Sequence, residues 1–136
     1  MIAMKLAGID LDPQHDWADE YDWDPVAQEQ SRTLTGKLVV QEGVKVHGRP
    51  ITLDGTGCAW TPLSVVRQLE ALRDQPGLVM PLVLPDGRTF SVIFNRADGA
   101  SLVARPVHRE VAPALTDPFE VVLRLVTVAP PPPTTP

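Results

Sequence analysis

The chain has 136 residues, a formal net charge of −5 and 43% apolar residues, which fits a single globular domain. The acidic balance argues against a nucleic-acid-binding surface, because such a surface needs clustered Lys and Arg to neutralise phosphates. The single cysteine, Cys58, excludes an intrachain disulfide and a cysteine zinc site, and no apolar run approaches the ~20 residues of a membrane span.

The N-terminal part predicts a short strand over Met1–Ile9, without the basic and long apolar segments of a secretion signal. Residues Asp10–Asp24 follow and read "DLDPQHDWADEYDWD", seven acidic side chains interleaved with three aromatic ones. We predict an irregular arm here and call it the acidic segment. Its aromatic spacing also fits a short helix.

Two stretches in the first half have strand composition. They are Thr33–Gln41, "TLTGKLVVQ", and Val44–Leu53, "VKVHGRPITL". We expect the two to pair as a long hairpin. Pro50 has no N–H to donate, so it belongs at a bulge or an edge.

The stretch "LDGTGCAWTP" predicts a glycine-rich loop that leads into a helix. Thr61 is a good N-cap, and Pro62 suits the first helical position. Apolar residues then recur at helical spacing, and Gln75–Gly77 ends the helix. The stripe consists of Leu63, Val65, Val66, Leu69 and Leu72.

The second half predicts strands. Two apolar runs flank Asp86–Gly87, a strong hairpin turn, and Phe90, Val92 and Phe94 share one face of the second run. Another strand is expected over Ala100–Val107. In the last strand, "FEVVLRLVTV", Phe119, Val121, Leu123 and Leu125 face one way. We therefore predict a mainly β (α+β) domain over residues 1–128, followed by a Pro-rich, disordered or polyproline tail at 129–136.

The sequence contains only weak signals for a catalytic or nucleotide-binding site. The glycines at Gly55–Gly57 lack the Lys and Ser/Thr of a phosphate loop and the third glycine of a dinucleotide loop, which favours a flexible strand-to-helix turn. Cys58 could act as a nucleophile if His47 or His108 met it in space. No local signature supports that pairing, and a small buried cysteine is the commoner role.

A metal site is also weakly supported. The spacing of Asp10, Asp12 and Asp16 resembles a calcium loop, but the sixth position is His15 and the twelfth is Tyr21. A second set could hold a metal, although a solvated acidic segment is more usual. That set is His15, Asp16, Asp19 and Glu20. We therefore assign no catalytic, cofactor or metal residue and expect no enzyme.

The aromatic residues of the acidic segment are candidates for an assembly interface. Trp17, Tyr21 and Trp23 are over half of the Trp and Tyr residues in the chain. Disordered acidic tails are usually poor in aromatics, whereas Trp and Tyr are enriched as interface anchors. Packing onto the core of the same subunit is an equally good interpretation.

Four stretches together resemble the small minor tail proteins of long-tailed bacteriophages. They are "WDPVAQEQSRTLTGKLVVQEGVKVHGRPITLDG", "AWTPLSVVRQLEAL", "LPDGRTFSVIF" and "DPFEVVLRLVTV". The resemblance covers Trp23–Val128. It implies a β-sandwich or a rolled antiparallel sheet with one packed helix, similar to tail-tube domains.

The resemblance also implies a structural role without cofactors. Such proteins form rings coaxial with the tail, often hexameric, near the distal end or tip of the tube. They dock neighbouring tube and tip-hub proteins, and DNA passes through without specific binding or any membrane insertion. The expected location is the virion, after assembly in the cytoplasm of the bacterial host. The alternative is a small monomeric module that binds a peptide or a carbohydrate.

Overall fold

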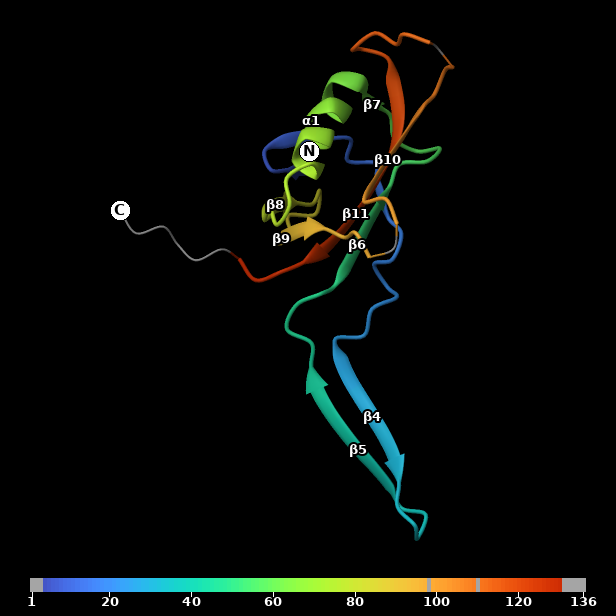
Figure 1. Ribbon diagram of the computed structural model, residues 1–136, viewed down its shortest axis with the longest axis vertical. Coiled ribbons are helices and arrows are strands. Elements are labelled where there is room, and N and C mark those ends of the chain that lie inside the picture. The colour runs from blue at the N-terminus through green and yellow to red at the C-terminus, as the bar shows by residue number, and fades with distance from the viewer. Residues whose placement is uncertain (1–3, 98, 110, 131–136) are drawn as a thin grey trace, which may run out of the picture.

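The computed structural model describes residues 4–97, 99–109 and 111–130 (Figure 1). It is mainly β, with one helix packed against antiparallel strands, which confirms the predicted α+β class. The elements are β1 Met4–Leu6, β2 Ile9–Leu11, β3 Asp16–Trp17, β4 Val26–Arg32, β5 Leu38–Val44, β6 Pro50–Asp54, β7 Thr61–Pro62, α1 Leu63–Arg73, β8 Met80–Val83, β9 Thr89–Phe94, β10 Leu102–Pro106 and β11 Pro118–Thr127.

Strand β11 is the centre of a nine-stranded sheet. Seven of its strands run in the order β2-β1-β8-β9-β11-β6-β3, and the other two, β7 and β10, also pair with β11. One edge of β11 pairs first with β7 and then with β6, and the opposite edge pairs first with β10 and then with β9. Phe119, Val121, Leu123 and Leu125 alternate with half-buried residues along β11, as the sequence predicts. The strand therefore supplies one row of the core over most of its length.

The core lies between this sheet and helix α1, which packs against β2, β7, β10 and β11. Leu63, Val66 and Leu69 are buried, while Val65 and Leu72 are half-buried, so the predicted stripe is confirmed. The predicted N-cap is wrong. Thr61 is buried in β7, and Pro62 takes the N-cap position with φ −66° and ψ 151° and no capping side chain.

The turn between β8 and β9 is confirmed at Asp86–Gly87. Leu84 N–H donates to Arg88 O at 2.9 Å, Gly87 N–H donates to Leu84 O at 3.0 Å, and Gly87 has φ +93°. Glycine tolerates this left-handed backbone without strain. The carboxylate of Asp86 accepts the backbone N–H of Arg88 at 3.1 Å and its guanidinium at 2.6 Å, and these contacts lower the pKa of Asp86.

The predicted long hairpin is wrong in its pairing. Strand β5 pairs with β4, which the sequence analysis missed, and "TLTG" at Thr33–Gly36 is the turn between them. The expected strand Val44–Leu53 breaks at residues 45–49, and its second half is β6 in the main sheet. Pro50 is the first residue of β6, a position where its missing N–H is tolerated.

The ends of the chain differ in part from expectation. The strand expected over Met1–Ile9 is two short strands, β1 and β2, joined by a turn at Ala7–Gly8; residues 1–3 lie outside the described part. The acidic segment contributes to β2 and β3 and is otherwise turns, with no helix. Ala129 and Pro130 are exposed, and the rest of the predicted Pro-rich tail lies outside the described residues. Within the described ranges, no helix is long and apolar enough to cross a membrane.

We expect Leu69→Ala to lower the free energy of unfolding by about 2–5 kcal/mol, because Leu69 is fully buried beneath α1. Leu34→Ala is the matched control, since Leu34 is fully exposed. Chemical denaturation followed by circular dichroism measures both. Equal stability of the two variants would contradict the packing of α1 described above.

Candidate functional site: the hairpin arm and its root

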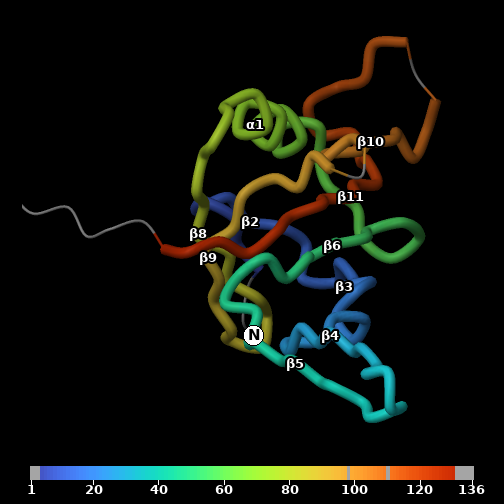
Figure 2. Tube along the Cα trace, turned by 60° about the horizontal axis from the view of Figure 1, so that its bottom comes forward, coloured from blue at the N-terminus to red at the C-terminus, as the bar shows by residue number. Residues whose placement is uncertain are grey.

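Strands β4 and β5 form a two-stranded hairpin that projects from the body, and we call residues 26–44 the hairpin arm (Figure 1). Every residue of the hairpin arm is exposed. The arm and α1 lie at opposite ends of the main sheet (Figure 2). An isolated two-stranded hairpin is at best marginally stable in water, because it has no second layer on which to bury apolar side chains.

One face of the hairpin arm is enriched in apolar side chains. Alternation along paired strands places Leu38, Val40 and Val44 on the same face, with Val26 directly opposite Val44. On this face Gln28 also donates to Glu42 across the strands at 2.6 Å. Exposed aliphatic side chains gathered on one face of a protruding element are typical of a protein-binding surface.

The tip of the hairpin arm is a tight and basic turn. Thr33 N–H donates to Lys37 O at 2.9 Å, Gly36 N–H donates to Thr33 O at 3.0 Å, and Gly36 has φ +90°. Arg32 donates to Gly36 O at 3.2 Å. Within the described residues, neither Arg32 nor Lys37 forms an ion pair, so the tip presents two unneutralised cations.

We call residues 23–25 and 45–49, which connect the hairpin arm to the body, its root. Alternating cations and aromatic rings hold the root. The guanidinium of Arg49 lies 4.5 Å from the ring centre of Trp17 and 5.6 Å from that of Trp23. Lys45 lies 5.6 Å from the ring of Trp23, and Arg88 lies 5.2 Å from the ring of Trp17. Each contact adds about 0.5–2 kcal/mol, depending on how far it is desolvated. Together they fix the direction in which the arm leaves the body.

The three aromatic residues predicted as an interface do not act as one group. Trp17 is only 8% exposed and packs edge-on against Phe90, with ring centres 5.8 Å apart, so it belongs to the core of its own subunit. Trp23 is half-buried in the root, and only Tyr21, at 90% exposed, is free for a partner. Sequence spacing could not separate these roles, because the cations that contact Trp17 are distant in the chain.

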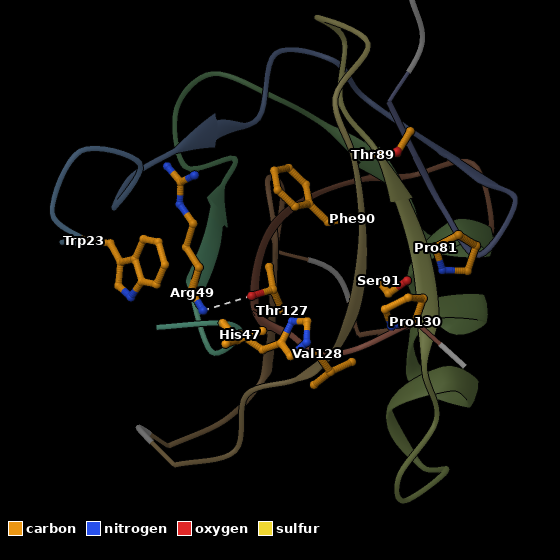
Figure 3. Close-up of a pocket in the computed structure, with 11 residues that line it drawn as sticks. Trp23, His47, Arg49, Pro81, Thr89, Phe90, Ser91, Thr127, Val128 and Pro130 are labelled. Carbon is orange, nitrogen blue, oxygen red and sulfur yellow. Dashed lines mark hydrogen bonds between the residues drawn. The ribbon is translucent and has the colours of Figure 1, made fainter. Parts of the chain in front are cut away.

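A groove opens beside the root of the hairpin arm and has a volume of about 530 Å³. Figure 3 shows Trp23 and Arg49 close together, with Pro81, Ser91 and Pro130 across from them. The backbone N–H of Arg49 donates to Thr127 Oγ1 at 2.9 Å, which ties this wall of the groove to the end of β11 (Figure 3). Aromatic, cationic and hydroxyl groups therefore meet in one open concavity.

A different surface is acidic. Asp16 in β3 lies directly opposite Asp54 in β6, and Asp12 accepts the backbone N–H of Trp60 from the neighbouring loop at 3.4 Å. We call Asp12, Asp16 and Asp54 the acidic edge. Like charges directly opposite each other in a sheet are destabilising. In the described part of the chain, no Lys or Arg lies within ion-pair distance of these three carboxylates.

The glycine-rich loop is anchored at its first glycine, Gly55, which is buried, whereas residues 56–58 are exposed. A Cβ on Gly55 would lie 2.8 Å from Nε2 of His15 and 3.0 Å from the carbonyl oxygen of Val121, so no larger residue fits there without movement. Gly55 N–H donates to Val121 O at 2.9 Å, and Cys58 and Ala59 donate back to Gly55 O. The loop thus closes on itself and is anchored to β11.

The candidate nucleophile is not in a catalytic arrangement. Cys58 is exposed, contrary to the expectation of a buried cysteine, and its Sγ lies 3.5 Å from the carbonyl oxygen of Asp54. His47 lines the groove at the root of the hairpin arm, and His108 lies between β10 and β11. Neither histidine is a hydrogen-bond partner of Cys58 in the described structure.

Three of the residues considered for a metal site, His15, Asp19 and Glu20, serve other contacts. Asp19 accepts from the backbone and hydroxyl of Thr52 at 2.9 and 2.8 Å, and Glu20 pairs with Arg88 at 2.8 Å. His15 is buried, and its Nδ1 donates to Asp12 O at 2.8 Å. Among the residues that can be described, no group of three or more His, Cys, Asp or Glu side chains could hold a metal ion.

No protein-family model, curated protein or solved structure matches this chain. The features of the molecule that bear on its function are therefore the hairpin arm, its root, the groove and the acidic edge.

We expect Trp17→Ala to destabilise the body by about 3–5 kcal/mol, because it removes a buried ring and two cation–π contacts. Tyr21→Ala should change stability by less than about 0.5 kcal/mol, because its ring is exposed. Thermal unfolding of the two variants measures the difference. If the Trp17→Ala variant is as stable as the Tyr21→Ala variant, Trp17 does not stabilise its own core and is again a candidate for the assembly interface.

Proposed function

We propose that this chain is a structural protein of a bacteriophage tail that forms a ring of identical copies near the distal end or tip of the tail tube. The observation that carries the proposal is the hairpin arm, which extends from a well-packed body and pairs with no further strand in the described part of the chain. The body buries a full core, so the arm is not needed to stabilise it. The arm lies outside the core and exposes apolar side chains, and such an element is suited to assembly.

The phage-like motifs fall on parts of the molecule that serve this role. "TLTG" forms the tip of the hairpin arm, and "GRPITL" forms its root and strand β6. "DGR" closes the β8–β9 turn, whose Arg88 also contacts Trp17 at the root. Two of the four stretches that carry the resemblance therefore build or hold the projecting arm, whereas "AWTPLSVVRQLEAL" forms α1 at the opposite end of the sheet.

Ring formation follows from the shape of such a contact. When a projection of one copy docks on a different surface of the next, the contact is heterologous, and repetition closes a ring if the rotation allows it. The net charge of −5 suits a ring around a DNA conduit, because like charges keep DNA from adhering to the wall.

A second candidate function is a small module that binds a peptide or a carbohydrate. The groove beside the root favours it, because Trp23, Arg49 and Ser91 combine an aromatic ring, a cation and a hydroxyl. A soluble ligand that saturates the isolated monomer and is lost with Trp23→Ala would support this alternative over ring assembly.

We expect immunogold electron microscopy of purified phage particles to place the chain at the distal end of the tail.

Replacing residues 26–44 with a short Gly-Ser linker should leave the body as stable as the parent, because Lys45 N–H donates to Pro25 O at 2.8 Å and the cut ends lie close together. The same variant should fail to enter tails, whereas Val111→Ala, a change at an exposed site outside the arm, serves as the folded control. Particles that lack the chain, or that incorporate the arm-less variant normally, would contradict the proposal.

A further inference from the structure

We propose that the tip of the hairpin arm docks on the acidic edge of a second copy of this chain, with Arg32 and Lys37 facing Asp16 and Asp54. This inference rests on the proposed function, because it names the surface that receives the arm in the ring. It is also open to a test on the purified protein alone.

The tip of the arm lies too far from the body for Arg32 and Lys37 to form ion pairs with the acidic edge of their own subunit. Each strand of the arm has seven residues, and at about 3.3 Å per residue they carry the tip on the order of 20 Å from the root. The arm points away from the body that bears the acidic edge (Figure 1). Among the described residues Arg32 and Lys37 therefore have no counter-charge, and both are free to pair with carboxylates on another molecule.

The charges of the two surfaces are complementary. Residues 32–37 contain two basic side chains and no acidic one, whereas residues 10–24 contain seven acidic side chains and neither Lys nor Arg. Two other carboxylates of this segment already form ion pairs, Asp10 with Lys5 and Glu20 with Arg88. In the described structure the carboxylate of Asp16 has no such partner, and it faces Asp54 across the β3·β6 pair. A cation placed between these two carboxylates would turn repulsion into attraction.

The apolar face of the arm supplies the affinity that exposed charges lack. Exposed ion pairs contribute little by themselves and are screened over about 8 Å at physiological salt. Leu38 and Val40 follow the basic tip on one face, so docking the tip also brings these two side chains toward the neighbour. Charge complementarity then sets the register, and apolar burial holds the contact.

The single cysteine of the chain allows a direct test. Cys58 is exposed and lies 3.5 Å from Asp54 O, so it already reports on the acidic edge. In a Leu34→Cys variant, each copy carries one thiol at the arm tip and one at the acidic edge. We expect mild oxidation of the concentrated protein to give a ladder of covalent oligomers, with peptides joining position 34 of one copy to Cys58 of the next.

Controls separate this contact from random collision. Val111→Cys places a thiol on another fully exposed site and should give few links to Cys58. Lys37→Glu in the Leu34→Cys chain should reduce the 34–58 links by about tenfold, because it sets like charges together. Adding Asp16→Lys should restore them by exchanging the charges, whereas Arg67→Glu on the exposed face of α1 should leave them unchanged.

The outcomes distinguish the inference from the proposed function. Links between position 34 and Cys58 that are no more frequent than the Val111→Cys control, or that ignore the charge exchange, would overturn the docking contact even if the chain is found in tails. Specific links from a chain that is absent from phage particles would support the contact and overturn the phage assignment instead.

Discussion

Strand β11 is the constraint on which the rest of the molecule depends, because four other strands pair with it, two along each edge. Val121, Leu123 and Leu125 are fully buried, so the strand can neither shift register nor leave the sheet without exposing a row of the core. Its end also holds the root of the hairpin arm, since Gly48 N–H donates to Thr127 O at 2.9 Å and Arg49 N–H donates to Thr127 Oγ1. A rigid base therefore sets the direction of a projecting element.

The body and the hairpin arm differ in how far their apolar side chains are buried. The body buries its apolar side chains within one chain, whereas the hairpin arm leaves its apolar and basic side chains in water. Proteins are stable by only about 5–15 kcal/mol, so a fully exposed hairpin persists only when its root is fixed or when a partner covers it. The stack of Lys45, Trp23, Arg49, Trp17 and Arg88 provides the first of these, and the proposed assembly would provide the second.

The sequence was informative for three features that neighbouring residues decide, although the local signal for an N-cap at Thr61 was wrong. The Asp86–Gly87 turn, the apolar stripe of α1 and the alternation of β11 are each encoded by neighbouring residues. Strand β4 was missed because "VAQEQSR" lies in water on both faces and has no apolar alternation to detect. The burial of Trp17 was left open for a related reason, since its surroundings in sequence are acidic while its contacts, Phe90, Arg49 and Arg88, come from other strands and loops. The acidic edge likewise forms only when β3 pairs with β6.

The central claim is that the hairpin arm is free in the isolated chain and covered in the assembled one. Amide hydrogen exchange of residues 26–44, measured in dilute solution and again in purified tails, tests it most directly. We expect the arm to exchange rapidly in dilute protein while β11 is strongly protected, and we expect its exchange to slow in the tail. An arm as protected as β11 in the dilute chain, or one that still exchanges rapidly in the tail, would contradict the claim.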